Sequence, residues 1–151
     1  MCEKYWNLCG QETKSKNQEM NKHIFKRLLP IIGIYKTLIE NGFTKEQALM
    51  ISHKEILHNA RSVAEENAKF AKMPFTYGLF KTFAKSHMDK KYPTEGFTVK
   101  YSCPGLCTLF CQSDITAFSG YESKIKFKRM GTLGGGANCC DFHFIHGNYC
   151  I

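Results

Sequence analysis

The stretch Lys124-Ile125-Lys126-Phe127-Lys128-Arg129 decides the fold, because its apolar and basic residues alternate strictly. A period of two places its isoleucine and phenylalanine on one face of a strand. A second alternating stretch, Cys140-Asp141-Phe142-His143-Phe144-Ile145, puts its two phenylalanines on one face and its aspartate and histidine on the other. The Gly-containing connection 132–138 joins them, so the sequence predicts an antiparallel pair of amphipathic strands.

Helical patterns precede this pair. Apolar residues recur at three- and four-residue steps from about residue 17, and Asn41-Gly42 is expected to end that helix. Pro30 lies inside the pattern and should kink or split it. Thr44-Lys45-Glu46-Gln47 predicts a capping box that starts a second helix. A third helix is expected from about 75 to 90.

The order of helices first and strands second predicts an α+β fold, with N-terminal helices packed on a C-terminal antiparallel sheet. We expect residues 1–16 to form a flexible N-terminal arm and residues 17–151 to form a single α+β domain. That domain should be helical over 17–91 and strand-rich over 96–146.

Two segments lie between the helices and the strand pair. Phe97-Thr98-Val99-Lys100-Tyr101 alternates and is rich in β-formers, so it is predicted to be a strand. The short apolar stretch from Cys107 to Cys111 is expected to start a helix that runs to about Phe118.

Composition bounds the class of protein. The chain has 151 residues, of which 43% are hydrophobic, and this is enough for one buried core. The sequence contains no run of about 18 apolar residues, so no membrane span is predicted. The first residues carry no signal-peptide pattern. We therefore expect a cytoplasmic protein whose thiols are mostly reduced.

The formal net charge is +8. Such a balance suits nucleic acid, an anionic membrane surface or a small anionic substrate. The lysines are scattered and no dense basic block occurs, so we expect a solvated basic surface and no nucleic-acid partner. Self-association is compatible with the sequence.

Cysteines are concentrated in the last third of the chain. Six of the eight lie there: Cys103, Cys107, Cys111, Cys139, Cys140 and Cys150. Structural zinc is usually held by closely paired cysteines or histidines, and this spacing differs from that pattern. Zinc is therefore a disfavoured interpretation, and no cofactor is predicted. Plain core packing is the favoured interpretation of Cys107, and a disulfide-based sensor is a further alternative.

Two cysteines lie close to acids, in the stretches Cys111-Gln112-Ser113-Asp114 and Cys140-Asp141. A thiolate can attack an electrophilic carbon, and a carboxylate can position water or take up a proton. Other interpretations remain open: Asp114 can cap a helix, and His143 can be structural. The turn Gly134-Gly135-Gly136 is either a flexible connection or a place where backbone amides approach a ligand.

Three ordered motifs resemble those of the L-2-amino-thiazoline-4-carboxylic acid hydrolase family. Residues 104–114 (PGLCTLFCQSD) resemble its P-E-L-x-x-x-F-C-x-x-D segment. Residues 128–136 (KRMGTLGGG) resemble its R-T-x-T-L-x-x-G segment, and residues 139–144 (CCDFHF) resemble its closing C-D-F-R-F. The resemblance is strongest over about 97–146.

The resemblance implies a hydrolase-like α+β domain. In the named activity, water adds to the amidine carbon of a thiazoline ring and the carbon–sulfur bond opens. Carried onto this sequence, it implies catalytic residues Cys111, Asp114, Cys140 and Asp141. It also implies substrate-binding residues Arg129, Thr132, Gly136 and His143, the last at a position where the family pattern has Arg.

The leading interpretation is therefore a hydrolase that opens a small cyclic amidine bearing a carboxylate. Cys111 or Cys140 would be the nucleophile, Asp114 or Asp141 the base, and Arg129 with the Gly-rich turn the anion holder. The alternative is a non-catalytic domain that binds a small ligand or a metal.

Overall fold

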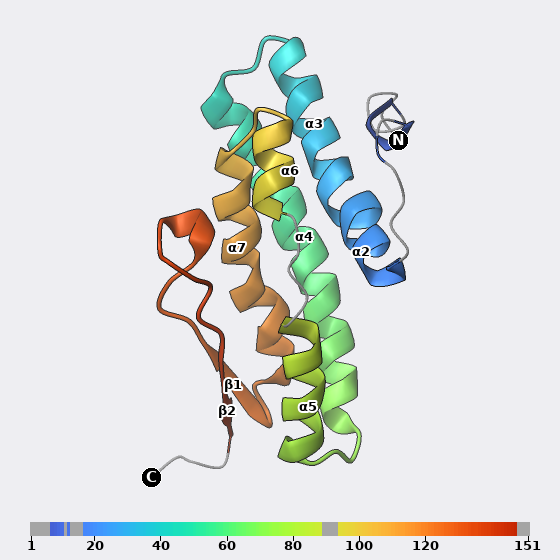
Figure 1. Ribbon diagram of the computed structural model, residues 1–151, viewed down its shortest axis with the longest axis vertical. Coiled ribbons are helices and arrows are strands. Elements are labelled where there is room, and N and C mark those ends of the chain that lie inside the picture. Colours follow the sequence, from blue (N-terminus) through green and yellow to red (C-terminus); the bar gives the residue numbers. More distant parts are fainter. Residues whose placement is uncertain (1–6, 11, 13–16, 89–93, 148–151) are drawn as a thin grey trace. The chain divides into compact units, whose positions relative to one another are not determined.

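The computed structural model of the chain describes residues 7–10, 12, 17–88 and 94–147, and Figure 1 shows its ribbon. Helices come first along the described part of the chain, and a short hairpin follows them. The helices are α2 (Gln18–His23), α3 (Leu29–Glu40), α4 (Lys45–Lys72), α5 (Tyr77–Met88), α6 (Thr94–Lys100) and α7 (Gly105–Phe118). The strands are β1 (Ile125–Lys128) and β2 (His143–His146).

The chain forms two compact units. The first comprises residues 1–56 and 92–107, and the second comprises residues 57–91 and 108–151. All eight predicted site residues belong to the second unit. The single domain at 17–151 and the flexible arm at 1–16 stay predictions. Most of that arm lies outside the described residues, although Leu8 within it is buried.

The first helical stretch changes character where the sequence contains proline. A π-helical turn over Ile24–Leu28 separates α2 from α3, and Pro30 lies in the first turn of α3. A first-turn proline is tolerated because its missing N–H has no intrahelical partner there. Gly42, with φ +85°, follows the end of α3, as the Asn41-Gly42 pair predicts.

The predicted capping box is confirmed at the start of α4. The Gln47 amide donates to the Thr44 hydroxyl at 3.2 Å, and the Thr44 amide donates to Gln47 Oε1 at 2.9 Å. These bonds satisfy amides that a helix start otherwise leaves unpaired. Among the described residues, no helix combines the length and the apolar character needed to cross a membrane.

The predicted strand at 97–101 is wrong, because this segment belongs to helix α6. Its alternation also fits a helix: Phe97 and Tyr101 are four residues apart, and their ring centroids lie 6.3 Å apart. Val99, which a strand would place with these rings, is 60% exposed. A five-residue pattern is too short to separate the two periods.

The strand-rich character predicted for 96–146 is therefore wrong over most of its length. α6 and α7 occupy its first half, and α7 confirms the helix predicted to run to Phe118. The second strand is also shorter than predicted, since it begins at His143 and excludes Cys140, Asp141 and Phe142. The side chains of Cys140 and Asp141 instead bond to the connection that precedes them.

The antiparallel pair itself is confirmed. Phe127 pairs with Phe144, and Lys128 pairs with His143. Two four-residue strands are marginally stable alone. Here the ring of Phe118, at the end of α7, lies 4.7 Å from the Phe127 ring and 5.1 Å from the Phe144 ring, measured between centroids. The Phe80 ring of α5 lies 5.3 Å from that of Phe144. Helices packed on an antiparallel pair confirm the α+β class.

We expect Gly120→Ala to destabilise the chain. A Cβ at this position would lie 2.0 Å from the backbone oxygen of Ala64 and 2.8 Å from Cβ of Asn67. Such overpacking should lower the free energy of unfolding by about 3 kcal/mol. Gly96→Ala is the matched control, because nothing lies within 4 Å of a Cβ there and the residue is helical. It should raise stability by about 0.5–1 kcal/mol. Urea unfolding midpoints measure both, and equal midpoints would contradict the packing at Gly120.

Candidate functional site

The predicted site residues gather around the connection between the two strands, residues 129–142, which we call the site loop. Its centre is a 3₁₀ turn over Leu133–Gly135. The Thr132 hydroxyl caps this turn by accepting from the Gly135 amide at 3.0 Å. Gly136 ends the turn with φ +86°, a left-handed conformation that favours glycine. Both residues therefore shape the loop itself.

Asp141 joins the two ends of the site loop. Its carboxylate accepts from the amide of Gly131 at 2.6 Å and from the amide of Met130 at 3.0 Å. Chiefly the Gly131 bond, with help from the Met130 bond, holds the pKa of the Asp141 carboxyl below its ordinary value near 3.8. His143 Nε2 lies 3.7 Å from Asp141 Oδ2, so the two side chains are close, although Asp141 precedes β2.

Arg129 ties the loop to α7. Its Nη1 donates to Asp114 Oδ2 at 3.0 Å and to the backbone carbonyl of Cys111. The Arg129 side chain is only 7% exposed, and the guanidinium carbon lies 6.0 Å from the centroid of the Phe142 ring. This guanidinium is therefore directed at the protein, and so is the carboxylate of Asp114.

Cys111 faces the central turn of the site loop. The backbone of Gly134 and the hydroxyl of Thr132 hydrogen-bond to its sulfur, while the hydroxyl of Thr108, one helical turn earlier, donates to the carbonyl of Gly134. Burial raises the pKa of the Cys111 thiol, and the neighbouring Cys140 adds to the rise. The hydrogen bonds offset only part of it, so Cys111 is a neutral thiol near pH 7.

Cys140 contacts the same turn. The Leu133 amide donates to its sulfur at 3.4 Å, and the residue is exposed. Both sulfurs thus contact one turn. The structure brings Cys111, Thr132 and Cys140 together at this turn, and it places Asp141 near His143. Arg129 and Asp114 form an ion pair.

The segment that contains the site resembles a known protein family. Residues 95–144 match the family model described as L-2-amino-thiazoline-4-carboxylic acid hydrolase. The resemblance drawn from the sequence motifs is confirmed over this segment, which contains all eight predicted site residues. The match supports a hydrolase-like domain. No curated protein and no solved structure matches the chain.

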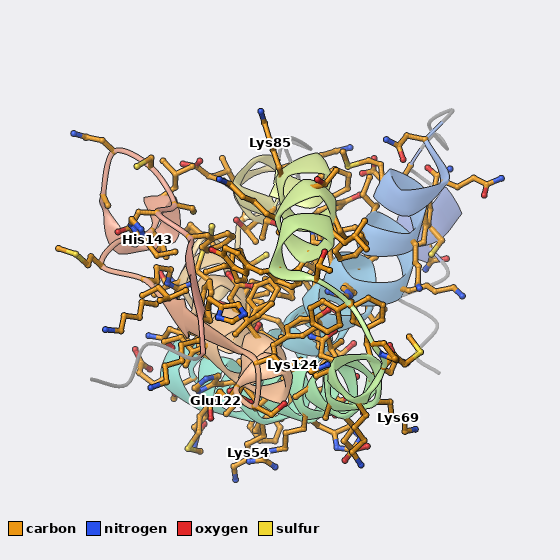
Figure 2. The ribbon with its side chains drawn as sticks, turned by 90° about the horizontal axis from the view of Figure 1, so that it is seen from below. Lys54, Lys69, Lys85, Glu122, Lys124 and His143 are labelled. Atoms are coloured by element: carbon orange, nitrogen blue, oxygen red, sulfur yellow. The ribbon has the colours of Figure 1, made fainter. Side chains whose placement is uncertain are left out.

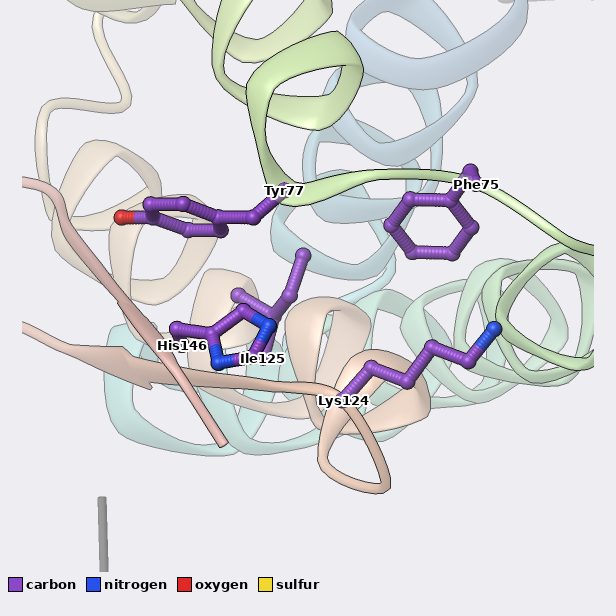
Figure 3. Close-up of a pocket in the computed structure, with 5 residues that line it drawn as sticks. All are labelled: Phe75, Tyr77, Lys124, Ile125 and His146. Atoms are coloured by element: carbon purple, nitrogen blue, oxygen red, sulfur yellow. The ribbon is translucent and has the colours of Figure 1, made fainter. Parts of the chain in front are cut away.

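A separate pocket lies at the far end of the hairpin. Figure 3 shows its lining by Phe75, Tyr77, Lys124, Ile125 and His146, around a volume of about 280 Å³. None of these is a predicted site residue. The Tyr77 hydroxyl donates to the carbonyl of Phe144 at 2.7 Å, and its ring lies 5.2 Å from that of His146. The only signal for this pocket in the sequence is the cluster of aromatic residues after Pro74.

Sequence reasoning also missed Thr108, which the three-residue spacing to Cys111 places on the same face of α7. Within the described part of the chain, no group of three or more His, Cys, Asp or Glu side chains is placed to hold a metal ion. Cys103 and Cys107 are buried.

The cysteines should differ in reactivity toward iodoacetamide. Cys139 and Cys140 are exposed and should be alkylated first at pH 7.5. Cys111 should react more slowly, because burial raises its pKa and the thiolate is the reactive form. Cys103 is buried, with its pKa raised to about 11, and should react only after denaturation. Mass spectrometry of peptides over time measures the order. Modification of Cys103 as fast as Cys139 would contradict it.

Asp141 should hold the site loop closed only while it is ionised. Because its pKa is lowered in the folded state, its contribution is present above the ordinary carboxyl value near 3.8 and is lost as the pH falls through the folded value. Asp141→Asn should speed hydrogen exchange of the Met130 and Gly131 amides at neutral pH. Glu122→Gln, an exposed carboxylate near β1, is the control and should change neither amide. Unchanged protection in Asp141→Asn would refute this role.

Proposed function

We propose that the chain is a hydrolase that opens a small cyclic amidine carrying a carboxylate, of the thiazoline class, at the site loop. The supporting observation is that two thiols, Cys111 and Cys140, both contact one turn of this loop. The family match over 95–144 supports the reaction class. Reactive thiols beside backbone amide donors are a common arrangement for attack on an electrophilic carbon.

Cys140 is the proposed nucleophile. It is exposed, and the Leu133 amide points at its sulfur, where it can stabilise negative charge. Cys111 is half-buried and neutral near pH 7, since burial raises its pKa. A neutral thiol can donate a proton, so Cys111 is better suited to protonate the leaving group than to attack.

In the proposed reaction, the Cys140 sulfur adds to the amidine carbon. The ring carbon–sulfur bond then breaks, and the ring sulfur leaves as a thiol with the proton from Cys111. Water then adds to the same carbon, the bond to the Cys140 sulfur breaks, and the new carbon–oxygen bond becomes the carbonyl of an N-carbamoyl cysteine. One water is consumed in total, and no oxidant or reductant is needed.

The proton acceptor for water is proposed to be His143. Asp141 is a poor base, because amides occupy its oxygens and its pKa is lowered. Asp114 is paired with Arg129. Imidazole is the side chain that most often accepts protons near neutral pH. Asp141, 3.7 Å from His143, would then orient the ring.

The substrate carboxylate is proposed to meet Lys128. Arg129 is engaged by Asp114 and the Cys111 carbonyl, so its charge is already compensated. Lys128 is exposed and is the cross-strand partner of His143. Directly paired residues of antiparallel strands project on the same face, with Cβ atoms about 5 Å apart. An ammonium group beside the proposed base suits a small anionic substrate.

A second candidate, binding without turnover, is favoured by one observation. The charged groups predicted from the sequence for catalysis, Asp114 and Asp141, and for substrate binding, Arg129, all bond to the protein itself. In that case the loop would bind the same class of molecule at Cys111 and Cys140 without opening it.

The test is ring opening of 2-aminothiazoline-4-carboxylate, followed by the release of product thiol. Cys140→Ser and Cys111→Ser should each lower kcat/KM at least about 100-fold. Cys139→Ser is the matched control, an exposed neighbour whose sulfur has no proposed role, and it should keep wild-type activity. Circular dichroism checks that each variant folds.

Full activity in both Cys140→Ser and Cys111→Ser would remove the thiol mechanism. Binding of the substrate by wild type without any release of thiol, measured by calorimetry, would favour the binding function. Activity of Cys139→Ser that falls as far as that of Cys140→Ser would show that the variants perturb the loop and not the chemistry.

A further inference from the structure

The pocket at the far end of the hairpin has no part in the proposed reaction. Its lining residues are Phe75, Tyr77, Lys124, Ile125 and His146, and all five belong to the second unit. None of them lies in the site loop. The pocket volume is about 280 Å³, and a cavity of roughly 150 Å³ already holds a benzene ring. The pocket can therefore take a single ring with a small substituent.

The apolar part of the lining is held in place by the core of the unit. Phe75 and Tyr77 both pack against the buried cluster that contains Ile125. The Tyr77 hydroxyl donates to the carbonyl of Phe144 at 2.7 Å, which fixes the direction of the ring. The His146 ring meets the Tyr77 ring edge-on, with an interplanar angle of 78°. These walls are therefore formed without a ligand, as is usual for small-molecule sites.

Lys124 supplies a positive charge to the same lining. Its ammonium donates to the carbonyl of Met73 at 2.8 Å and lies 4.7 Å from the centroid of the Phe75 ring. The charge is thus held beside a ring that also lines the pocket (Figure 3). An ammonium group has three N–H donors. The bond to Met73 uses one of them, so two can serve a ligand.

No acid of the described part of the chain compensates this charge. The lining contains no Asp or Glu, and the ion pairs between described side chains involve other residues. Lys124 is also half-buried, whereas Lys69 and Lys85 of the same unit are exposed and extend outward in Figure 2. A cation that is partly withdrawn from water and has no carboxylate partner favours an anionic ligand.

Rings and a single ammonium together select the class of ligand. Inorganic phosphate is strongly hydrated and needs more donors than one ammonium offers, and it would leave the rings without a partner. A neutral ring would leave the ammonium without a counter-charge. An aliphatic carboxylate would lose the contacts that aromatic rings make with one another at centroid distances of about 4.5–7 Å. A ring that carries one carboxylate satisfies both parts of the lining.

We propose that this pocket binds a small aromatic monocarboxylate. The carboxylate accepts from the Lys124 ammonium, and the ring lies against Phe75 and Tyr77. The site is distinct from the site loop, because Ile125 pairs with His146 at the opposite end of the hairpin. Binding there requires no turnover and is independent of the proposed hydrolase activity.

The test is titration of the full chain with benzoate at constant ionic strength, followed by amide chemical shifts in NMR spectra. Shifts should change at Phe75, Tyr77 and Ile125 and stay constant at Leu133 and Gly134 of the site loop. The expected Kd is about 1 mM, as for a ligand of this size. Benzamide, the neutral analogue, should bind about tenfold more weakly, because it lacks the charge-assisted bond.

The role of Lys124 is tested by substitution. Lys124→Met should weaken benzoate binding about tenfold and leave benzamide binding unchanged. The unchanged benzamide affinity shows that the pocket of this variant is intact. Lys124→Arg keeps the charge and should keep the benzoate affinity within about threefold. Lys126→Met is the matched control, an exposed lysine of β1 outside the pocket, and should bind like wild type.

The aromatic part of the ligand is tested by changing its ring. Cyclohexanecarboxylate carries the same charge as benzoate on a saturated ring of similar size. It should bind about fivefold more weakly than benzoate, because it lacks the contacts between aromatic rings. Inorganic phosphate should bind more weakly than either.

Several outcomes would overturn the proposal. One is the absence of shift changes at benzoate concentrations up to about 20 mM, about twentyfold above the expected Kd. Others are equal affinities for benzoate and benzamide, equal losses in Lys124→Met and Lys126→Met, and tighter binding of cyclohexanecarboxylate or phosphate than of benzoate. Benzoate binding that is lost in Lys128→Met would place the ligand at the site loop and would also overturn it. None of these outcomes depends on ring-opening activity.

Discussion

The contact of Phe118 with Phe127 and Phe144 supports the rest of the second unit. Two strands of four residues cannot hold a hairpin by their backbone bonds alone. The three rings, with centroids 4.7–5.2 Å apart, bury one face of the hairpin against the end of α7. Because the site loop connects these two strands, its geometry depends on this packing.

Once the hairpin is fixed, the polar residues at the site loop and on the adjoining part of α7 divide into two classes. Arg129, Asp114 and Asp141 bond to the protein and give the loop its shape. Cys140 and His143 remain exposed at its surface. In the proposed function, Arg129, Asp114 and Asp141 are therefore positioning residues. The thiol of Cys140 and the imidazole of His143 take part in the reaction.

The hairpin also separates two different surfaces. Lys128 and His143 pair at the end of the strands that adjoins the site loop, and Ile125 and His146 pair at the opposite end, beside the pocket. Three residue steps along a strand span about 10 Å. The site loop and the pocket therefore lie at opposite ends of the hairpin, although one unit carries both.

The sequence by itself determined the elements whose signals are local. The capping box at Thr44, the stop at Gly42 and the alternation in β1 each depend on neighbouring residues, and all three appear as predicted. It also identified the cysteine–acid pairs and the family segment. The strand predicted at 97–101 is wrong, because five residues fit the period of a strand and that of a helix equally well. The segment is helical and buries Thr98.

Only the tertiary structure decided what the site residues do. That Arg129 pairs with Asp114, fifteen residues away, and that Asp141 bonds back to Gly131 follow from the folding of the loop onto α7. Burial then sets the protonation of Cys111. No spacing in the sequence encodes these contacts, because they arise from the aromatic packing that brings the hairpin and the helix together.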